Sequence, residues 1–516
     1  MKKNTNFLMT KIIATLGPAT DSIEKILELI EAGVRVFRIN FSHGSFNDYD
    51  KLIVNIRNAE DRSGQFVGIL GDLSGPKIRV GKVIPEGVIL KNGQEIKFVK
   101  KEIIGGSLGF EYSFSTTYPQ FIDEVKIGER ILLDDGNIQL KCNEKRGLGE
   151  DAFLLCEVVE GNLLTTAKGI NLPDSELSLP SLTEKDYECL DYAIKKSVDY
   201  LALSFVRSGE DIRHLKEKMK QANARPQGLD ITSGDMGFST SFEDNYIPII
   251  SKIEKPQAID NLEEILEESD GIMVARGDLG VEMDLAEVAL LQKKIINMCR
   301  HHMKPVIVAT QMLQSMIDNP VPTRAEVSDV ANAIMDGADA VMLSGETAVG
   351  NYPVHAVKMM ARVADKTQKY QVEQFGSKGN FMPYEGLLSR KAAMARGVAM
   401  MAKDMKAKFI VTWTHSGGSS VFLSQQKLQI PIIACGENKK RLQQMSILYS
   451  IMPLFMKQPK SGSKFIAAVN QMILNNEWAK EGDPIIIVAS SPITRRGVTN
   501  RVILHYVGEK NEETEN

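Results

Sequence analysis

The sequence has little that would mark a membrane, secreted or nucleic-acid-binding protein. No apolar run reaches the roughly 18 residues that a membrane-spanning helix requires. The five cysteines are scattered and show no C-x-x-C spacing, which indicates reduced thiols rather than a disulfide framework or a zinc site. Lysine and arginine total 62 against 66 aspartate and glutamate, so the net charge of −4 gives no general affinity for nucleic acid. We therefore expect a soluble cytoplasmic protein with neither a nucleic-acid nor a membrane partner.

What the sequence does contain is a repeated alternation of β-rich runs and amphipathic helical segments. This alternation is typical of a parallel sheet built from βαβ units. Thr323 and Glu326 form a capping-box pattern, which predicts the start of one of the helices. Eight strand–helix units predict a TIM barrel. The predicted strands are residues 11–16, 35–40, 67–72, 199–205, 247–254, 271–276, 305–310 and 338–343.

Changes of pattern divide the chain into three domains, in keeping with a length above the roughly 250 to 300 residues of a single core. A β-rich insertion with a hairpin signal, D-D-G-N at residues 134–137, predicts an all-β lid domain, a small β-barrel, over the site end of the TIM barrel. Residues 224–246 are rich in Gly, Ser and Asp and predict a surface loop. Further strands after a polar linker, at residues 409–412, 431–435, 484–489 and 501–507, predict a C-terminal α/β regulatory domain. The predicted boundaries are 1–76 and 177–355 for the TIM barrel, 77–176 for the lid, 356–386 for a helix and linker, and 387–516 for the C-terminal domain.

Polar residues follow the predicted barrel strands at their carboxyl ends. Lys252 and Glu254 stand two positions apart at the end of an apolar strand, so both side chains point to the same face. Each such residue alone could be a structural ion pair, a strand end or a turn. Together they predict an active site, because buried strand ends are otherwise apolar and TIM-barrel sites form at this end. The collection comprises Arg38, Asn40, Ser42, His43, Asp72, Lys252, Glu254, Arg276, Asp278, Thr310, Gln311, Ser344 and Glu346.

The charges in this collection suit phosphate chemistry. Glu254 and Asp278 supply carboxylates from neighbouring strands, few enough to leave Mg²⁺ room for substrate oxygens and water. Arg38 and Lys252 would cover the charge of a phosphoryl group in transit. The glycine-containing run 276–280 would expose backbone N–H groups that suit a carboxylate. The implied substrate carries both a phosphate and a carboxylate.

Five sequence motifs resemble the pyruvate kinase family. They are I-N-F-S-H-G at 39–44, I-I-S-K-I-E at 249–254, M-V-A-R-G-D-L-G at 273–280, A-T-Q-M-L at 309–313 and M-L-S-G-E-T-A at 342–348. The resemblance covers nearly the whole chain, including the insertion and the C-terminal domain. It implies that the phosphoryl group of phosphoenolpyruvate passes to ADP, giving ATP and, after protonation of the enolate, pyruvate in glycolysis. It also implies a homotetramer, the usual state of the family.

The resemblance assigns roles to matching residues. Lys252 would stabilise the moving phosphoryl group and the enolate, Arg38 would bind the phosphate, and Glu254 with Asp278 would hold Mg²⁺ or Mn²⁺. The proton donor itself stays open. Thr310, Ser344 and Glu346 would position the hydroxyl or water that protonates the enolate, and the substrate would contact Gly277, Asp278 and Thr310, with Arg38. The nucleotide would contact Asn40, His43 and Arg79. A monovalent cation would bind Asn40, Ser42, Asp72 and the Leu73 carbonyl.

Lys77 departs from the family's K⁺-dependent pattern. That pattern reads D-T-K-G-P-E, whereas residues 72–77 read D-L-S-G-P-K, so a lysine stands in place of the glutamate. The chain thereby resembles the K⁺-independent branch. A fixed ammonium can supply the charge that K⁺ would bring, and we predict that K⁺ is not required. The alternative is that Lys77 lies in solvent at the hinge of the lid.

A second phosphate site is predicted in the C-terminal domain. The run 412–420 follows a strand and precedes a helical stretch, so its hydroxyl and N–H groups could bind a phosphate, although such a turn can also be purely structural. The resemblance places a phosphorylated allosteric effector here. Fructose 1,6-bisphosphate, AMP and a sugar monophosphate stay open as its identity. The predicted contacts are Thr414, Ser416, Gly417, Ser419, Ser420 and Arg496.

Two other functions are compatible with the fold. One is a catalytically inactive sensor of sugar phosphates or nucleotides, which we would expect to lack Lys252, Glu254, Asp278 or Thr310, although all four are present. The other is a different Mg²⁺-dependent barrel enzyme on phosphoenolpyruvate or an oxoacid, such as a lyase, which would need neither lid nor nucleotide corner. Formation of ATP from phosphoenolpyruvate and ADP distinguishes the three.

Overall fold

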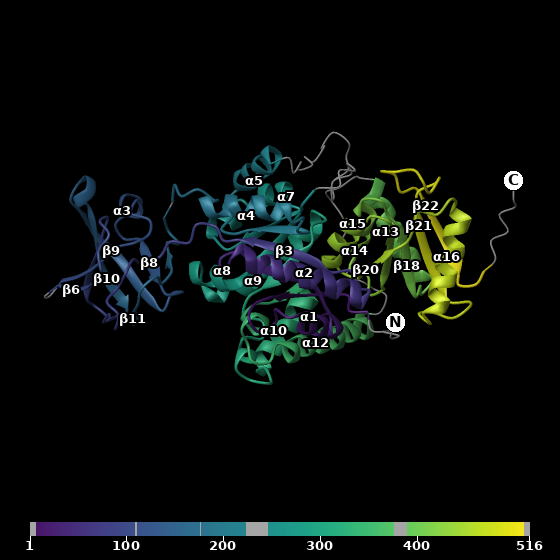
Figure 1. The fold of residues 1–516 in the computed structure, drawn as a ribbon, viewed down its shortest axis with the longest axis horizontal. Coiled ribbons are helices and arrows are strands. Elements are labelled where there is room, and N and C mark those ends of the chain that lie inside the picture. Colours follow the sequence, from purple (N-terminus) through teal and green to yellow (C-terminus); the bar gives the residue numbers. More distant parts are fainter. Residues whose placement is uncertain (1–6, 109–110, 176, 223–245, 376–389, 510–516) are drawn as a thin grey trace.

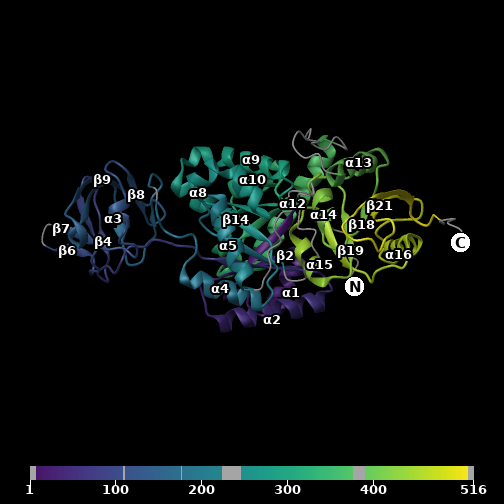
Figure 2. The same ribbon diagram turned by 90° about the horizontal axis from the view of Figure 1, so that it is seen from above.

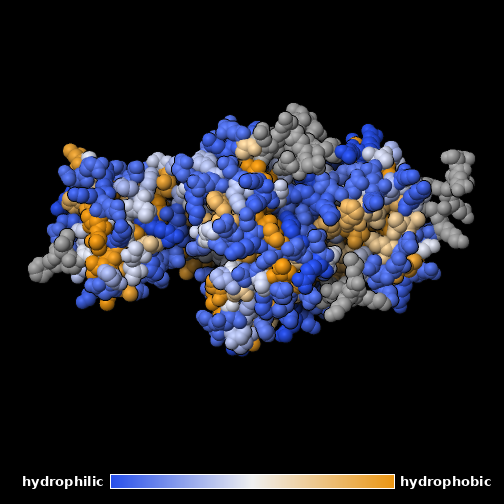
Figure 3. All heavy atoms as spheres, in the orientation of Figure 1, coloured by the Kyte–Doolittle hydropathy of each residue, from blue (hydrophilic) through white to orange (hydrophobic). Residues whose placement is uncertain are grey.

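The computed structural model describes residues 7–108, 111–175, 177–222, 246–375 and 390–509. Three regions follow one another along its long axis, with the β-rich insertion at one end, a barrel in the centre and an α/β domain at the other end (Figures 1 and 2). On the face drawn in Figure 3, hydrophilic side chains cover most of the surface and apolar side chains form smaller groups. None of the described helices is long and apolar enough to cross a membrane. This architecture confirms the predicted fold class.

The central region is a closed barrel of eight parallel strands in the order β1-β17-β16-β15-β14-β13-β3-β2. Every residue of β3, β13, β15, β16 and β17 is buried, as expected for strands covered on both faces. Each strand coincides with a predicted one, shortened or shifted by a few residues. The observed bounds are β1 Lys11–Thr15, β2 Val34–Asn40, β3 Gly68–Leu73, β13 Tyr200–Leu203, β14 Ile249–Ile253, β15 Gly271–Ala275, β16 Val306–Ala309 and β17 Ala340–Leu343.

Helices surround the barrel, and their ends follow local sequence signals. Thr323 accepts a hydrogen bond from the Glu326 N–H in the predicted capping box, which opens α10. Gly33 ends α1 with a φ of 126°, a conformation that other residues rarely adopt. The helices of this region are α1 Ile23–Ala32, α2 Phe46–Ser63, α4 Glu184–Lys195, α5 Gly209–Gln221, α6 Pro256–Asp260, α7 Leu262–Glu268, α8 Arg276–Glu282, α9 Leu285–His301, α10 Arg324–Asp336, α11 Gly345–Ala348 and α12 Pro353–Phe375.

The barrel strands divide their side chains between two apolar cores. Ile12 belongs to the core between strands and helices, whereas its neighbour Ile13 belongs to the core inside the barrel. The inner core continues into Val421 and Phe422 of the C-terminal domain. That domain therefore closes the amino-terminal end of the barrel, and the carboxyl ends of the strands are left to form a site.

The insertion is a mixed β domain with one short helix, α3 Phe121–Glu124. A seven-stranded sheet runs in the order β12-β8-β9-β10-β5-β7-β6, and β11 pairs with β4. Residues 79–83 form single bridges to Gly169 before β12, to Thr116 after β7 and to Gly105 before β6, so irregular backbone rather than a regular strand closes the larger sheet. The strands are β4 Val88–Ile89, β5 Glu95–Val99, β6 Gly106–Leu108, β7 Glu111–Phe114, β8 Arg130–Leu133, β9 Ile138–Arg146, β10 Phe153–Glu160, β11 Leu163–Leu164 and β12 Ile170–Asn171.

The C-terminal domain has a five-stranded sheet in the order β20-β19-β18-β21-β22, in which only β22 is antiparallel to its neighbour. Four of its strands match the predicted ones, and β20 was not predicted. The elements are α13 Arg390–Asp404, β18 Phe409–Trp413, α14 Gly418–Ser424, β19 Ile432–Gly436, α15 Lys439–Gln444, β20 Ile451–Phe455, α16 Gly462–Asn475, β21 Pro484–Ala489 and β22 Arg501–Tyr506.

Two lysines of the C-terminal domain bind buried carboxylates at the amino-terminal end of the barrel. Lys440 Nζ lies 2.7 Å from Asp199 Oδ1, and Lys427 Nζ lies 2.7 Å from Asp339 Oδ1. Both aspartates are fully buried. Gln425 also donates to Asp339, over 2.8 Å. Breaking a buried pair leaves an uncompensated charge, so these contacts attach the two domains firmly.

Some sequence expectations fall outside the described residues. The loop predicted at 224–246 is one of them, apart from the buried Tyr246. The predicted linker lies partly inside α12, which continues to Phe375, and partly in residues 376–389, which are not described. The domain boundaries therefore stay predictions at single-residue level.

Candidate active site

A cavity of about 560 Å³ lies at the carboxyl ends of the barrel strands and reaches the first residues of the lid. Arg38 and Asn40 end β2, Asp72 lies near the end of β3, and Lys252 belongs to β14. Asp278 lies in the first turn of α8. The predicted residues that line the cavity are Arg38, Asn40, Ser42, His43, Asp72, Lys77, Arg79, Lys252, Glu254 and Asp278.

Lys252 is the centre of a buried charge network. Its Nζ lies 3.0 Å from Glu254 Oε1 and 3.5 Å from Asp72 Oδ1, and it donates to Ser204 Oγ over 2.8 Å. Burial alone would lower the pKa of Lys252, but Asp72 and Glu254 hold it above its ordinary value. Lys252 is therefore a permanent, oriented cation.

Arg38 is held beside this network by β1 and β3. Its Nε lies 2.6 Å from Asp72 Oδ2, and Nη1 donates to Thr15 Oγ1 over 3.1 Å. Burial disfavours the charge of Asp72, yet Lys252 and Arg38 together keep its pKa below the ordinary value. One carboxylate thus holds two cations at the floor of the cavity.

Of the two predicted metal ligands, Glu254 is held by a backbone hydrogen bond, and Asp278 lies in the first turn of α8. Glu254 Oε2 accepts from the Phe205 N–H over 2.7 Å, which fixes the carboxylate. Burial raises the pKa of Glu254, Lys252 opposes this, and Asp278 adds to it. A divalent cation would relieve that repulsion, and carboxylate oxygens are the ligands Mg²⁺ prefers. The residues therefore fit such an ion, although among the described residues no group of three or more His, Cys, Asp or Glu forms a metal cluster.

Thr310 and Gly277 contact each other outside the lining of the cavity. Thr310 adopts a φ of 69°, which is unusual for a threonine, and its Oγ1 accepts from the Gly277 N–H over 2.6 Å. The Gly277 N–H therefore already donates to Thr310 in this structure, whereas the sequence predicted that it would be exposed to a substrate carboxylate. Arg276 donates to Asp329 Oδ1 over 2.6 Å and to the Thr310 carbonyl over 3.0 Å, so it supports the loop instead of facing the cavity.

Glu346 and Ser344 do not line the cavity. Glu346 is fully buried, and its two oxygens accept from the N–H groups of Leu313 at 3.1 Å and Ser344 at 2.7 Å. Within the described part of the chain, the buried Ser344 Oγ has no hydrogen-bond partner. The structure thus places Glu346 as an anchor of two loops and leaves the Ser344 hydroxyl available.

The residues of the predicted monovalent-cation corner lie together. Asn40 Oδ1 accepts from the Ser42 N–H over 3.1 Å, and Ser42 Oγ donates to Ser74 Oγ over 2.9 Å. The carbonyl of Leu73 accepts from Ser204 Oγ over 2.7 Å. One of the expected cation ligands is therefore already used by a neighbouring hydroxyl.

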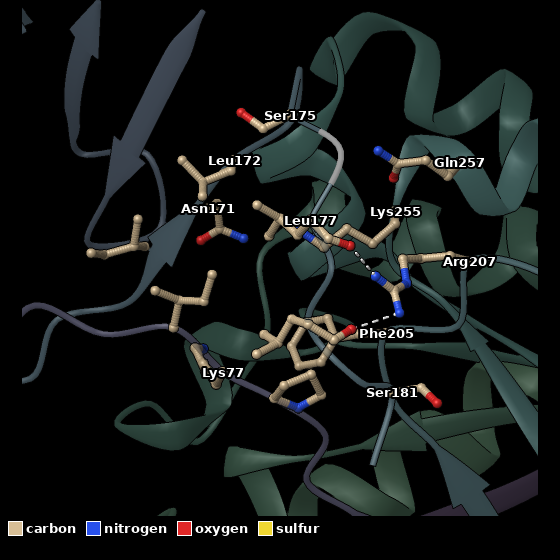
Figure 4. A pocket seen from close by; sticks show the side chains of 14 residues that line it. Lys77, Asn171, Leu172, Ser175, Leu177, Ser181, Phe205, Arg207, Lys255 and Gln257 are labelled. Atoms are coloured by element: carbon tan, nitrogen blue, oxygen red, sulfur yellow. Dashed lines mark hydrogen bonds between the residues drawn. The ribbon is translucent and has the colours of Figure 1, made fainter. Parts of the chain in front are cut away.

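Lys77 lies in the hinge between barrel and lid (Figure 4). It is exposed, and its Nζ lies near Gly169 of the lid. It lines both the main cavity and a hinge cavity of about 190 Å³. Arg207 fastens the returning hinge segment by donating to the carbonyls of Leu177 at 2.9 Å and Leu179 at 2.8 Å. The ammonium thus stands at the mouth of the site on a segment that a moving lid would carry.

Sequence reasoning missed several polar contributors. Thr15 ends β1 and binds Arg38, and Ser204 directly follows β13 and binds Lys252. Lys185 lines the cavity from α4. Thr15 and Ser204 obey the strand-end rule that identified the charged residues, so that rule, applied to small hydroxyl residues, would have found them.

The predicted effector residues are brought together only in part. Gly417 has a φ of 90°, and its N–H donates to Thr414 Oγ1 over 2.9 Å. Ser419 Oγ lies 2.5 Å from Thr499 Oγ1, which joins the loop to the exposed segment of Arg496. Ser420 is fully buried, contrary to the expectation of a ligand contact. A separate cavity of about 190 Å³ lies nearby, and sequence reasoning did not identify its polar lining residues, which are Lys460, Ser461, Ser490, Ser491 and Arg501.

A closed α/β barrel whose cavity holds cations and carboxylates next to an inserted β domain fits one class of protein, the phosphoryl-transfer enzymes.

Comparison with known proteins narrows the class. Residues 7–231 and 239–357 match the family model "Pyruvate kinase, barrel domain", and residues 392–505 match "Pyruvate kinase, alpha/beta domain". The chain is 39% identical over 500 residues to "Pyruvate kinase" of Mycobacterium intracellulare, covering 97% of this chain and 98% of that protein. It is 38% identical over 493 residues to "Pyruvate kinase" of Thermotoga maritima, covering 96% and 98%.

The chain belongs to the pyruvate kinase family and is a phosphotransferase. The predicted family is confirmed, and the predicted inactive sensor is not favoured. A relative from Geobacillus stearothermophilus, 37% identical over 510 residues, includes further sequence, because the match covers 97% of this chain but 80% of that protein.

Proposed function

We propose that this chain transfers the phosphoryl group of phosphoenolpyruvate to ADP in the cytoplasm, giving pyruvate and ATP in glycolysis. The observation that carries the proposal is the network of Lys252 with Glu254 and Asp72, at 3.0 and 3.5 Å, in a cavity shared by barrel and lid. Family membership supports the same substrates. Phosphoryl transfer depends mainly on positioning and charge stabilisation, which such a network provides.

Each cation has a defined task in this proposal. Lys252 faces the phosphoryl group and then the enolate oxygen, and Arg38 binds a phosphate oxygen while Asp72 keeps it oriented. Glu254 and Asp278 would hold Mg²⁺ or Mn²⁺, which supplies positive charge to the substrate oxygens. The raised pKa of Lys252 keeps it protonated at neutral pH.

Protonation of the enolate requires a donor on the opposite side. Thr310 and Ser344 supply hydroxyls there, and Glu346 positions Ser344 through its backbone N–H. Family membership assigns Gly277 to the substrate carboxylate, and its N–H would have to leave Thr310 Oγ1 to bind that group. We assign these residues to positioning and leave the final donor open.

The nucleotide and monovalent-cation assignments follow from family membership, and several of these residues line the cavity. Asn40, His43 and Arg79 line it towards the lid, where ADP would enter. Lys77 stands at the same mouth without a hydrogen bond or ion pair among the described residues. We therefore propose that its ammonium replaces K⁺ and that turnover does not require potassium.

We further propose a homotetramer that binds a phosphorylated effector at the loop of Thr414, Ser416, Gly417 and Ser419. The loop's junction with the segment of Arg496 supports this place. Ser416→Ala should abolish activation by fructose 1,6-bisphosphate, AMP or glucose 6-phosphate, whichever activates the unchanged protein, and should spare the basal rate. Retained activation would remove the effector assignment and leave the catalytic proposal intact.

A coupled assay tests the activity directly. With phosphoenolpyruvate, ADP and Mg²⁺, the protein should form ATP and pyruvate in equal amounts, and chelation of the metal should stop both. A lyase would consume phosphoenolpyruvate without forming ATP. No ATP in the presence of Mg²⁺ would overturn the proposal.

A further inference from the structure

Two cysteines face each other across neighbouring strands of the lid. Cys142 belongs to β9 and Cys156 to β10, and the two are register partners in this antiparallel pair. Both side chains are fully buried in the apolar core of the lid. Neither lines the catalytic cavity, so the catalytic chemistry does not explain the pair.

Backbone hydrogen bonds establish which kind of cross-strand site the pair occupies. The Cys142 N–H donates to the Glu129 carbonyl over 3.0 Å, and the Cys142 carbonyl accepts from the Gly128 N–H over 2.7 Å. Both groups therefore point towards β8 and away from β10. The pair therefore corresponds to a non-hydrogen-bonded position, where Cα atoms lie about 4.5 Å apart in a regular ladder. That separation falls within the roughly 4.4 to 6.8 Å that a disulfide spans. The register shifts next to the pair, between Leu155 and Cys156.

The thiols already interact with each other. The neighbouring Cys156 thiol lowers the pKa of Cys142, and Cys142 together with burial raises the pKa of Cys156. Cys142 Sγ also lies 3.9 Å from the Glu144 carbonyl oxygen. Cys142 is therefore the better nucleophile of the two. In contrast, burial raises the pKa of Cys189 to about 11 and that of Cys435 to about 12, and it also raises the pKa of Cys299.

We propose that Cys142 and Cys156 are a redox modification site, at which a peroxide converts the two thiols into a reversible disulfide within the lid. The Cys142 thiolate attacks the peroxide O–O bond, forming a sulfenic acid and releasing the first water. The Cys156 thiol then attacks that sulfur, the S–S bond forms, and its proton leaves with the hydroxyl as the second water. Two thiols lose two electrons and one hydrogen peroxide gains them.

The bond would restrain the lid without changing the catalytic residues. It would join β9 and β10 on both sides of their connecting turn, residues 147–152, where two glycines adopt positive φ. A covalent link across such a turn limits how far the strands can separate. Hydrogen peroxide is small and uncharged, so local opening of the lid suffices for access. A reducing thiol restores both cysteines.

The test uses the full chain, reduced, desalted and treated with hydrogen peroxide. Denaturation in N-ethylmaleimide should then label three cysteines instead of five. Peptide mapping should find one link, between residues 142 and 156, and dithiothreitol should restore all five labels. Five labelled thiols, sulfonic acids without a link, or a link that involves another cysteine would overturn the proposal.

Two variants make the assignment specific. Cys189→Ala removes an isolated buried thiol and should leave the link intact. Cys156→Ala should prevent the link and leave a Cys142 sulfenic acid that dimedone traps. If Cys156→Ala does not fold, the peptide map of the unchanged chain still shows whether residues 142 and 156 are linked. Hydrogen exchange in β9 and β10 should slow after oxidation, and equal exchange would refute the restraint on the lid.

Discussion

Replacement of Lys252 by methionine tests the central charge network. Methionine keeps much of the length and the apolar stem of lysine but removes the ammonium. The side chain of Lys252 is 12% exposed, and its Nζ lies 3.0 Å from Glu254 and 3.5 Å from Asp72. Asp72 keeps its 2.6 Å contact with Arg38, whereas Glu254 loses its cation and keeps only the Phe205 N–H. We therefore expect a folded protein whose catalytic cavity has lost one positive charge.

The expected loss follows from the chemistry at that position. A single neutral donor aimed at developing charge contributes about 10² to 10³ in kcat. Lys252 is fully charged and shielded from water, so Lys252→Met should lower kcat by at least roughly 10³-fold. The KM for phosphoenolpyruvate should change far less, because Arg38 still binds the ground-state phosphate. Glu254 should also bind protons more tightly, since Lys252 opposes the rise in its pKa.

The assay is steady-state ATP formation, with circular dichroism to verify folding. Lys255→Met is the matched control, because Lys255 pairs with Glu282 in the hinge and does not line the catalytic cavity. The control should lose stability through its broken ion pair and keep kcat within the same order of magnitude. A folded Lys252→Met protein with kcat within about tenfold of the unchanged enzyme would refute the role of Lys252.

Three further predictions follow from the same contacts. Burial raises the pKa of Glu254, and Mn²⁺ binds the ionised carboxylate. The apparent Kd for Mn²⁺, measured by calorimetry, should therefore rise by up to about tenfold per pH unit as the pH falls below that pKa. A Kd that does not change with pH would contradict this prediction. The unchanged protein should turn over equally in potassium-free buffer and with added K⁺, whereas Lys77→Glu should need K⁺; a manyfold stimulation of the unchanged protein would refute the proposal. Lys440→Met leaves the buried Asp199 short of one cation and should destabilise the chain by about 3 to 5 kcal/mol in denaturant unfolding, while the exposed Lys439→Met should be nearly neutral.

The sequence sufficed to predict the barrel because its strands are buried on both faces. Such strands are near-continuous apolar runs, so a charged residue at the end of one is conspicuous, as Lys252 and Glu254 are. β20 was missed because Pro453 lies within it, and proline argues against a central strand. β20 is in fact the edge strand of its sheet, the position where proline is tolerated.

The sequence could not indicate which polar side chains form hydrogen bonds within the protein instead of facing the cavity. Glu346 and Asp278 both lie in glycine-containing turns after strands, yet Glu346 accepts two backbone N–H groups and Asp278 faces the cavity. Ser420 stands three residues after the bend at Gly417, and the start of α14 buries it completely. These outcomes depend on which backbone groups meet the side chain after folding, which local pattern does not encode.

The C-terminal domain is attached to barrel strands that also carry residues of the site. The Ile69 N–H donates over 2.7 Å to Asp199, the carboxylate that Lys440 binds, and three residues further along β3 stands Asp72, which orients Lys252. Asp339, bound by Lys427, directly precedes β17, and Ser344 directly follows that strand. Lys440 thus reaches β3 through Asp199, and Lys427 binds the residue that precedes β17. The carboxyl-terminal part of β3 carries Asp72, and Ser344 follows β17. If a ligand binds the C-terminal domain and shifts either lysine, the shift would reach a strand that also carries a residue of the site.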